Sequence, residues 1–323
     1  MPSARNLIPL LALLLPASLS AQQAPIVLPL DYSGHHLYLT LTDDHLGPLN
    51  LMLDSGFART SIAATVANKG EVHTSFWRRS ISWNGFGTGP SKHRYQTADV
   101  SLRSGQTSIF TGSALVADFS GFAKEPGHPV DGFLGWDFLQ KWCATIDYAP
   151  PRLTLRDPAH CPVPSAPHAT LSGQWSSQGF LVPSQLTFAN GHSAKALLHF
   201  DTGSDATVFL NTQFRSVAGL DPSPATDATP GSRGWGVNGH YTSDTVPLAK
   251  FALEDGQLHF DLDSHTTIAI ARPGAFSTIH WWEGPTAVRI NHDGVIGSVL
   301  LQRLSWTFDP AAKRVYASLA GGN

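Results

Sequence analysis

The stretch LMLDSG (residues 51–56) recurs later in the chain as LLHFDTG (197–203), and in each copy an aspartate follows an apolar run. Burial disfavours an ionised carboxylate, so placing Asp54 and Asp201 at the ends of two buried strands costs free energy. If the fold brings the two together, one carboxyl can keep a proton while the other acts as a base. A lone Asp-Ser/Thr-Gly triplet also occurs in ordinary turns, so the prediction depends on the pair.

The sequence around the two triplets repeats as well. The window DGFLGWDFLQKWCATID (131–147) aligns without a gap with DGVIGSVLLQRLSWTFD (293–309), and seven of its positions are identical. Between triplet and window, each half has a glycine-aromatic-glycine element, GFGTG (85–89) and GWGVNG (234–239). Three matches in the same order indicate a duplicated domain.

These motifs resemble those of the aspartic proteases. In that family a small residue, and later often a threonine, follows the active-site Asp-Thr/Ser-Gly, and DTGSDATV (201–208) is similar to the retropepsin version. The first copy keeps the spacing, with Thr60 where Thr207 stands in the second. DGFLG (131–135) is similar to the segment that retropepsins and pepsins place beside this turn, and FGTG (86–89) is similar to a pepsin flap tip.

The resemblance implies an all-β, bilobal acid-protease fold, built from two homologous retropepsin-like lobes in a fused, bacterial-type secreted form. It implies that the aspartates of the two lobes activate a water molecule against a peptide bond. The catalytic residues would be Asp54 and Asp201. The residues that support the two turns would be Ser55, Gly56, Thr202 and Gly203. The candidate flap and substrate-binding residues are Phe86, Gly87, Trp235, Gly236 and Asp205.

Two features depart from the family pattern. Phe57 stands where the family usually has a small residue, as Ser204 is in the second copy, and a phenyl ring there would shift the first turn or narrow the site. Asp205 resembles a retropepsin position that contacts the substrate backbone and pairs with an arginine. Trp136 and Ser298 occupy the two positions where that arginine is often found.

His199 lies two residues before Asp201, so strand alternation places both on one face. A cationic histidine there would lower the pKa of the aspartates, but we interpret His199 as a hydrogen-bonded core residue. HWW (280–282) is either an apolar subsite or ordinary core packing. No His-Glu-x-x-His occurs, so a metalloprotease helix is not indicated, and no Gly-x-Ser-x-Gly occurs, so a serine hydrolase of that type is not supported. The acid-protease resemblance implies no metal and no cofactor.

The composition indicates a folded chain with few charges. Of 323 residues 42% are hydrophobic and 14% charged, and the net charge of −3 without basic runs argues against nucleic acid as a partner. Short alternating stretches such as LYLTL (37–41), with 29 glycines and 23 prolines, predict many strands joined by turns. The expected partner is a peptide or an unfolded protein.

The N-terminal residues 1–21 read as a secretory signal peptide, with Arg5, the apolar run LIPLLALLL (7–15) and small residues at 17–21. No membrane anchor is expected after its removal, and the protein is predicted to be secreted or periplasmic. The predicted organisation is an N-terminal lobe at 22–158, a proline-rich linker at 159–169 and a C-terminal lobe at 170–323. We expect a monomer that forms an intramolecular pseudo-dimer.

Cys143 and Cys161 are the two cysteines of the chain. In an oxidising compartment they are expected to form a disulfide that ties the segment between the lobes to the first lobe. The alternative is two buried free thiols. Two isolated cysteines do not make a zinc ligand set.

The sequence therefore predicts a secreted aspartic endopeptidase. Two alternatives stay open at this point. The first is a catalytically inactive peptide-binding or scaffolding protein that keeps the fold, with Phe57 as its best support. The second is a structural secreted β-protein in which both triplets are ordinary turns.

Overall fold

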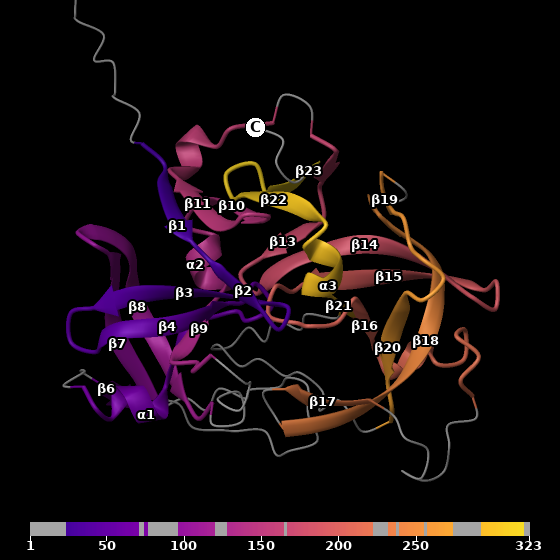
Figure 1. Ribbon diagram of the computed structural model, residues 1–323, viewed down its shortest axis with the longest axis horizontal. Helices are drawn as coiled ribbons and strands as arrows, with labels where there is room; N and C mark the ends of the chain where they lie inside the picture. Colours follow the sequence, from indigo (N-terminus) through magenta and orange to yellow (C-terminus); the bar gives the residue numbers. More distant parts are fainter. Residues whose placement is uncertain are drawn as a thin grey trace, which may run out of the picture.

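The structure is a computed structural model. It describes residues 24–70, 74–76, 96–119, 128–164, 167–221, 232–236, 239–254, 257–273 and 292–319. The predicted signal peptide (1–21), the first flap tip with Phe86 and Gly87, and HWW (280–282) lie outside these ranges. In the described ranges the chain is mostly β, with two lobes side by side and a third sheet across their upper side (Figure 1). The predicted all-β, two-lobed architecture is confirmed.

The first lobe is built on a sheet that curls back on itself. Its order in the described residues is β2-β3-β4-β9-β5-β8-β7-β6, and an additional pairing of β3 with β7 closes it into a barrel-like shape. The strands are β2 (Asp31–Ser33), β3 (His36–Asp43), β4 (Gly47–Leu53), β5 (Ser61–Ala63), β6 (Thr74–Phe76), β7 (Gln96–Ser104), β8 (Thr107–Ala117) and β9 (Gly132–Leu134).

The second lobe repeats this plan. Its described sheet runs β13-β14-β15-β21-β16-β20-β18-β17, β19 pairs with β18, and an additional pairing of β14 with β18 closes it. The strands are β13 (Gln174–Ser176), β14 (Gly179–Phe188), β15 (Ser193–Phe200), β16 (Val208–Leu210), β17 (Ser232–Gly236), β18 (Gly239–Leu253), β19 (Leu258–Phe260), β20 (Thr267–Ala271) and β21 (Gly294–Ile296).

A central sheet takes strands from both halves of the chain, in the order β1-β11-β10-β22-β23-β12. The strands are β1 (Ile26–Pro29), β10 (Cys143–Tyr148), β11 (Pro151–Arg156), β12 (Ala169–Leu171), β22 (Leu304–Asp309) and β23 (Arg314–Leu319). The halves meet where β10 pairs with β22, and there Thr145 faces Thr307 with 2.9 Å between the two hydroxyl oxygens. These threonines are equivalent in the repeated window, so a pseudo-twofold axis passes between them.

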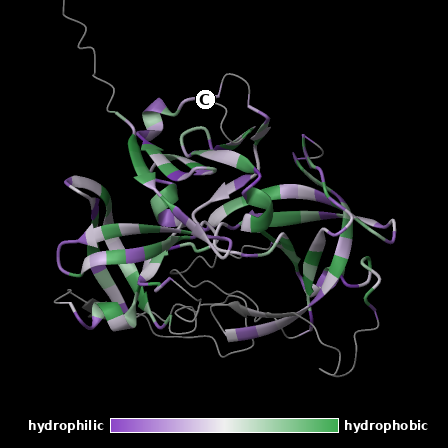
Figure 2. Ribbon diagram, in the orientation of Figure 1, coloured by the Kyte–Doolittle hydropathy of each residue, from purple (hydrophilic) through white to green (hydrophobic). Residues whose placement is uncertain are grey.

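Alternating side chains explain the layers of the lobes, and Figure 2 shows hydrophobic and hydrophilic residues interleaved along many strands. In β3, Leu37, Leu39 and Leu41 are buried, whereas Thr40 and Thr42 are exposed. β22 is buried along its whole length because other strands and helices cover both of its faces. One continuous apolar cluster runs through both lobes and the central sheet.

In each lobe, the strand that precedes the Asp-Ser/Thr-Gly triplet lies beside the strand of the repeated window. β4 runs parallel to β9, which in turn pairs antiparallel with β5, and β15, β21 and β16 are arranged in the same way. The crossing is tight, since a Cβ atom on Gly132 would lie 2.1 Å from the carbonyl oxygen of Ser61. On Gly294 a Cβ would lie 2.0 Å from the carbonyl oxygen of Phe209. The glycines shared by the two windows are therefore steric requirements.

The described helices are short, and two of them, α2 (Trp136–Leu139) and α3 (Ser298–Leu301), follow the window strands β9 and β21. The others are α1 (Ala64–Ala67), η2 (Pro158–His160) and η3 (Thr212–Phe214). Trp136 at the start of α2 is fully buried, and its indole Nε1 donates to the carbonyl oxygen of Ser176, 2.8 Å away in the second lobe. Its ring packs against Trp175, with 4.7 Å between the ring centroids. Trp136 therefore holds the two lobes together.

The predicted disulfide is present. Cys143 at the start of β10 is bonded to Cys161 just after η2, with 5.3 Å between the Cα atoms. The bond ties the beginning of the predicted linker (159–169) to the central sheet, and β12 begins at Ala169 near the linker's end.

The helices of the described ranges are all short, and none of them is long and apolar enough to cross a membrane.

Candidate active site

The two Asp-Ser/Thr-Gly turns are joined by four reciprocal hydrogen bonds at the centre of the molecule. The hydroxyl of Thr202 accepts from the backbone N–H of Ser55 at 2.9 Å and donates to the carbonyl of Leu53 at 2.9 Å. In return, the hydroxyl of Ser55 accepts from the N–H of Thr202 at 3.0 Å and donates to the carbonyl of Phe200 at 2.8 Å. Ser55 and Thr202 are almost completely buried, so each hydroxyl satisfies two backbone groups of the opposite lobe that have no access to water.

These four hydrogen bonds place Asp54 and Asp201 close to each other. The N–H groups of Asp54 and Asp201 donate to Leu134 and Ile296 of the neighbouring window strands, both at 3.0 Å. A Cβ atom on Gly56 would lie 2.3 Å from Cγ of Asp201, and one on Gly203 would lie 2.3 Å from Cγ of Asp54. Each turn can approach the opposite carboxyl only because its third residue is glycine.

The carboxyl groups share a hydrogen bond, and both have raised pKa values. Burial raises the pKa of Asp54 to about 6, although hydrogen bonds from Asp201 and from the backbone N–H groups of Gly56 and Phe57 lower it. Burial and then the neighbouring Asp54 raise the pKa of Asp201 well above its ordinary value, and it accepts one backbone hydrogen bond, from Gly203 at 3.0 Å. The pair therefore favours a state in which Asp201 holds the proton and Asp54 is ionised.

Phe57 takes part in the backbone contacts of the first turn. Its N–H donates to Oδ1 of Asp54 at 3.0 Å, and its carbonyl accepts from Trp136 N–H at 2.7 Å. In the second turn the carbonyl of Ser204 accepts from Ser298 N–H at 2.8 Å. The carbonyl at this position therefore contacts the following helix in the same way in both lobes, so Phe57 keeps this contact of the turn.

The first turn has a further support that the sequence did not reveal. Asp137 of α2 accepts, at 2.7 Å each, from the hydroxyl and the N–H of Thr60. In the repeated window Val299 stands at the equivalent position, so this bond has no counterpart in the second lobe. Because the contact joins residues 77 positions apart, only the family resemblance of Thr60 pointed toward it.

The candidate substrate-binding residue Asp205 is exposed, and none of the described residues forms an ion pair or hydrogen bond with its carboxylate. Trp136 and Ser298, at the two positions where the family often has an arginine partner for this aspartate, make other contacts. Trp136 bonds across the lobes, and the hydroxyl of Ser298 donates to the carbonyl of Thr202 at 2.9 Å.

The second candidate flap is a hairpin of β17 and β18. Trp235 pairs with His240 along its backbone, and Gly236 pairs with Gly239. The ring of Tyr241 lies beneath Gly234, where a Cβ atom would be 2.0 Å from Cζ of the tyrosine. Burial raises the pKa of Tyr241, and the carboxylates of Asp205 and Asp201 raise it further. The hairpin therefore starts beside the second Asp-Thr-Gly turn.

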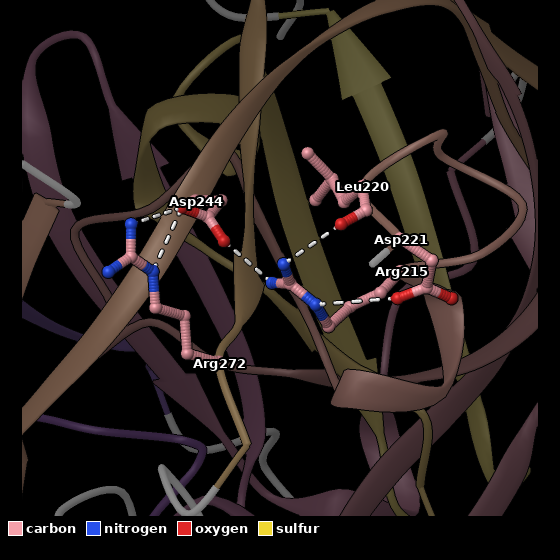
Figure 3. A network of polar contacts seen from close by, with 5 residues as sticks. All are labelled: Arg215, Leu220, Asp221, Asp244 and Arg272. Carbon is pink, nitrogen blue, oxygen red and sulfur yellow. Dashed lines mark hydrogen bonds and ion pairs between the residues drawn. The ribbon is translucent and has the colours of Figure 1, made fainter. Parts of the chain in front are cut away.

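An ionic network holds the base of this hairpin, and it was missed from the sequence. Asp244 of β18 accepts from Arg215 at 2.6 Å and from Arg272 at 2.6 and 2.9 Å, as Figure 3 shows. Arg215 also donates to the carbonyl of Leu220 at 3.3 Å. Burial alone would raise the pKa of Asp244, but the two arginines hold it below its ordinary value. The network connects the segment after η3, the end of β20 and the flap strand.

His199 lies in the core, as predicted, and one of its two ring nitrogens, Nε2, has no hydrogen-bond partner among the described residues. It lies against Gly179, where a Cβ atom would be 1.9 Å from Nε2, and its ring is 5.5 Å from that of His292. Burial, followed by His292, lowers the pKa of His199 to about 3. His199 is therefore neutral and places no cation beside the aspartates.

The structure was compared with known proteins. No protein-family model matches the sequence, and no curated protein sequence matches it. Among solved structures, the aspartic proteinase from Irpex lacteus is similar, with a TM-score of 0.56, 13% identity, and coverage of 92% of this chain and 98% of that chain. Basic 7S globulin from soybean is similar with a TM-score of 0.50, 13% identity, and coverage of 91% and 94%. The fold is that of the pepsin-like aspartic proteases.

The predicted bilobal acid-protease fold is thus confirmed. In this fold the Irpex lacteus proteinase and the present chain share their layout over nearly the whole length of both. In the part of the chain that the structure describes, no cluster of three or more His, Cys, Asp or Glu side chains forms a metal-binding group.

Replacing Thr202 by Val should destabilise the protein by about 2–4 kcal/mol, because the N–H of Ser55 and the carbonyl of Leu53 would both lose a buried partner. Thr202→Ser keeps the hydroxyl and should cost only about 1 kcal/mol. Denaturant unfolding of both variants checks this, and equal losses would mean that the hydroxyl bonds do not hold the lobes.

His199 should make the folded state sensitive to acid. Its pKa is lower in the folded than in the unfolded state, so its contribution to stability is complete above pH 6.5 and is lost as pH falls toward 3. Between pH 7 and pH 4 the wild type should lose about 3 kcal/mol through this residue alone.

His199→Met, which introduces the residue that stands at the equivalent position 52, should remove that part of the pH dependence. His259→Met, a change at an exposed histidine, should leave it intact. Melting temperatures from pH 4 to 7 test the difference, and parallel curves for wild type and His199→Met would contradict it.

Proposed function

We propose that this protein is an aspartic endopeptidase that hydrolyses peptide bonds with a water molecule activated between Asp54 and Asp201. One observation carries the proposal: hydrogen bonds between homologous turns hold two buried carboxyl groups together, so close that a Cβ atom on Gly56 or Gly203 would lie 2.3 Å from the opposite carboxyl carbon. An ordinary pair of surface turns would have no reason to bury both groups together.

We infer a different role for each carboxyl. Asp54 accepts two backbone hydrogen bonds and is the more easily ionised, so it takes a proton from the water as the oxygen attacks the peptide carbonyl carbon. Asp201 keeps its proton until the attack, when it donates to the carbonyl oxygen. A proton then passes to the leaving amine as the C–N bond breaks, and no covalent intermediate forms.

The substrate class follows from the surroundings of the dyad. The β17–β18 hairpin begins beside the second turn, and its backbone groups can pair with an extended peptide. The proposed substrate is therefore a peptide or an unfolded protein. Phe86, Gly87, Trp235, Gly236 and Asp205 remain the proposed contacts on the substrate side.

The proposed organisation and location go with this activity. We infer a bacterial-type secreted form, with a signal peptide at 1–21, lobes at 22–158 and 170–323, and a linker at 159–169. The disulfide supports an oxidising compartment, so the proposed location is outside the cytoplasm, secreted or periplasmic. The protein would act as a monomer that needs no metal or cofactor.

Asp201→Asn should abolish cleavage of an unfolded protein substrate, lowering kcat/KM by at least about a thousandfold, because the acid of the reaction is lost. Asp99→Asn makes the same change at an exposed position of β7 and should leave turnover unchanged. Mass spectrometry of the digest provides the measurement. If well-folded wild type cleaves nothing and still binds peptides, the protein is the non-catalytic binding protein instead.

The pH profile tests the assigned roles. Below about pH 6 both carboxyls carry protons and no base is available, so kcat/KM should rise with pH through about 6 and fall only when Asp201 ionises. Activity on a fluorogenic peptide mixture from pH 4 to 8 checks this, with circular dichroism at each pH to confirm folding. A maximum near pH 3 would overturn the assignment.

A further inference from the structure

The face of the first-lobe sheet that carries Asp54 is apolar. Along β4, Leu51 and Leu53 belong to the main core, so Met52 faces the other side, as does Asp54 two residues later. Met52 is paired with Phe133 of β9, and both belong to a separate buried cluster. The other members of this cluster are Tyr38, Ala63, Leu115, Phe119 and Val130. A substrate side chain beside Asp54 would lie against this cluster, which we call the first-lobe wall.

Phe57 covers that wall. Its ring is stacked on Phe133, with 5.3 Å between the centroids and 26° between the planes, and it meets Phe119 edge-on at 6.4 Å. Phe133 beneath it is only 1% exposed, whereas Phe57 is half-buried. Since Phe57 keeps the backbone contact of the turn with α2, the effect of its ring is to fill space next to the dyad.

In the second lobe the residue equivalent to Phe57 carries no ring. Ser204 corresponds to Phe57, and its hydroxyl accepts from the N–H of Ala206 at 3.3 Å. Below it, His199 and Val295 take the positions of Met52 and Phe133. The apolar cluster there consists of Phe209, Ala271 and Val295. The two walls beside the dyad therefore differ in volume and in polarity.

We propose that Phe57 determines specificity by closing the first-lobe subsite next to Asp54. With the ring in place, this subsite accepts substrate residues with small side chains, such as glycine, alanine and serine, and rejects large apolar ones. The residue on the other side of the scissile bond, against the second lobe, is not restricted by Phe57. The inference rests on the proposed function and defines its substrate class.

The test is a cleavage-site profile. A peptide library with all residues at both positions flanking the scissile bond is digested by wild type, Phe57→Ser and Phe57→Leu, and cleaved bonds are identified by mass spectrometry. Wild type should cleave where one flanking residue is small. Phe57→Ser should gain about tenfold in kcat/KM for leucine, methionine and phenylalanine at that position, with no change at the other. Phe57→Leu should gain less.

Phe251→Leu is the matched control, because it makes the same change in a buried ring of β18 that packs on Phe260, away from the cluster beneath Phe57. It should leave both preferences unchanged. A thermal melt confirms that each variant is folded, and Phe57→Leu keeps an apolar side chain on Phe133 if Phe57→Ser does not fold. The proposal is overturned if wild type already prefers large apolar residues on both sides, or if the Phe57 variants change neither side or both alike.

A failure of the proposed function is distinguishable from a failure of this inference. If no library peptide is cleaved, the same library is incubated with the Asp201→Asn protein, with and without Phe57→Leu, and bound peptides are recovered by ultrafiltration. The closed subsite is supported if the protein with Phe57→Leu retains peptides enriched in large apolar residues at one position and the protein with Phe57 does not. It is rejected if both proteins retain the same peptides.

Discussion

The structure depends on the four hydrogen bonds that Ser55 and Thr202 exchange. Each hydroxyl serves two backbone groups of the opposite lobe, so neither turn is fully hydrogen-bonded without the other. Because the hydroxyls are buried in the assembled molecule, no water can replace one of these bonds when it is lost. The same bonds bring each glycine of the triplets against the opposite carboxyl. Interlobe stability and the electrostatics of the aspartate pair thus have one common origin.

Duplication gave the two lobes the same backbone, and their side chains have since become different. Asp54 accepts two backbone N–H groups and Asp201 one, which separates their proton affinities. Thr60 has a partner in Asp137, while Val299 leaves Thr207 without such a partner. Chemistry that needs one acid and one base requires this kind of difference, and near-identical turns provide it through their neighbours.

The sequence predicted the features that repeat or that lie close together in the chain. The triplets, the glycine-bearing windows and the strand alternation of LYLTL identified the fold, and the presence of two cysteines after a predicted leader led to the predicted disulfide. Contacts between distant residues were not predictable, because nothing local marks them. The bond from Trp136 to Ser176 and the arginines around Asp244 belong to this group. For His199, strand alternation predicted the face of the side chain but not its neighbours, Gly179 and His292.

The central sheet has a consequence for how the chain folds. Three of its strands come from each half, and they join where Thr145 lies beside Thr307. In the folded protein β10 and β22 cover each other's backbone edge, but either half alone would leave its edge strand unpaired. An unpaired edge strand is a template for association with other chains. A first half synthesised ahead of the rest would therefore be vulnerable to aggregation until β22 and β23 (304–319) are available to pair with it.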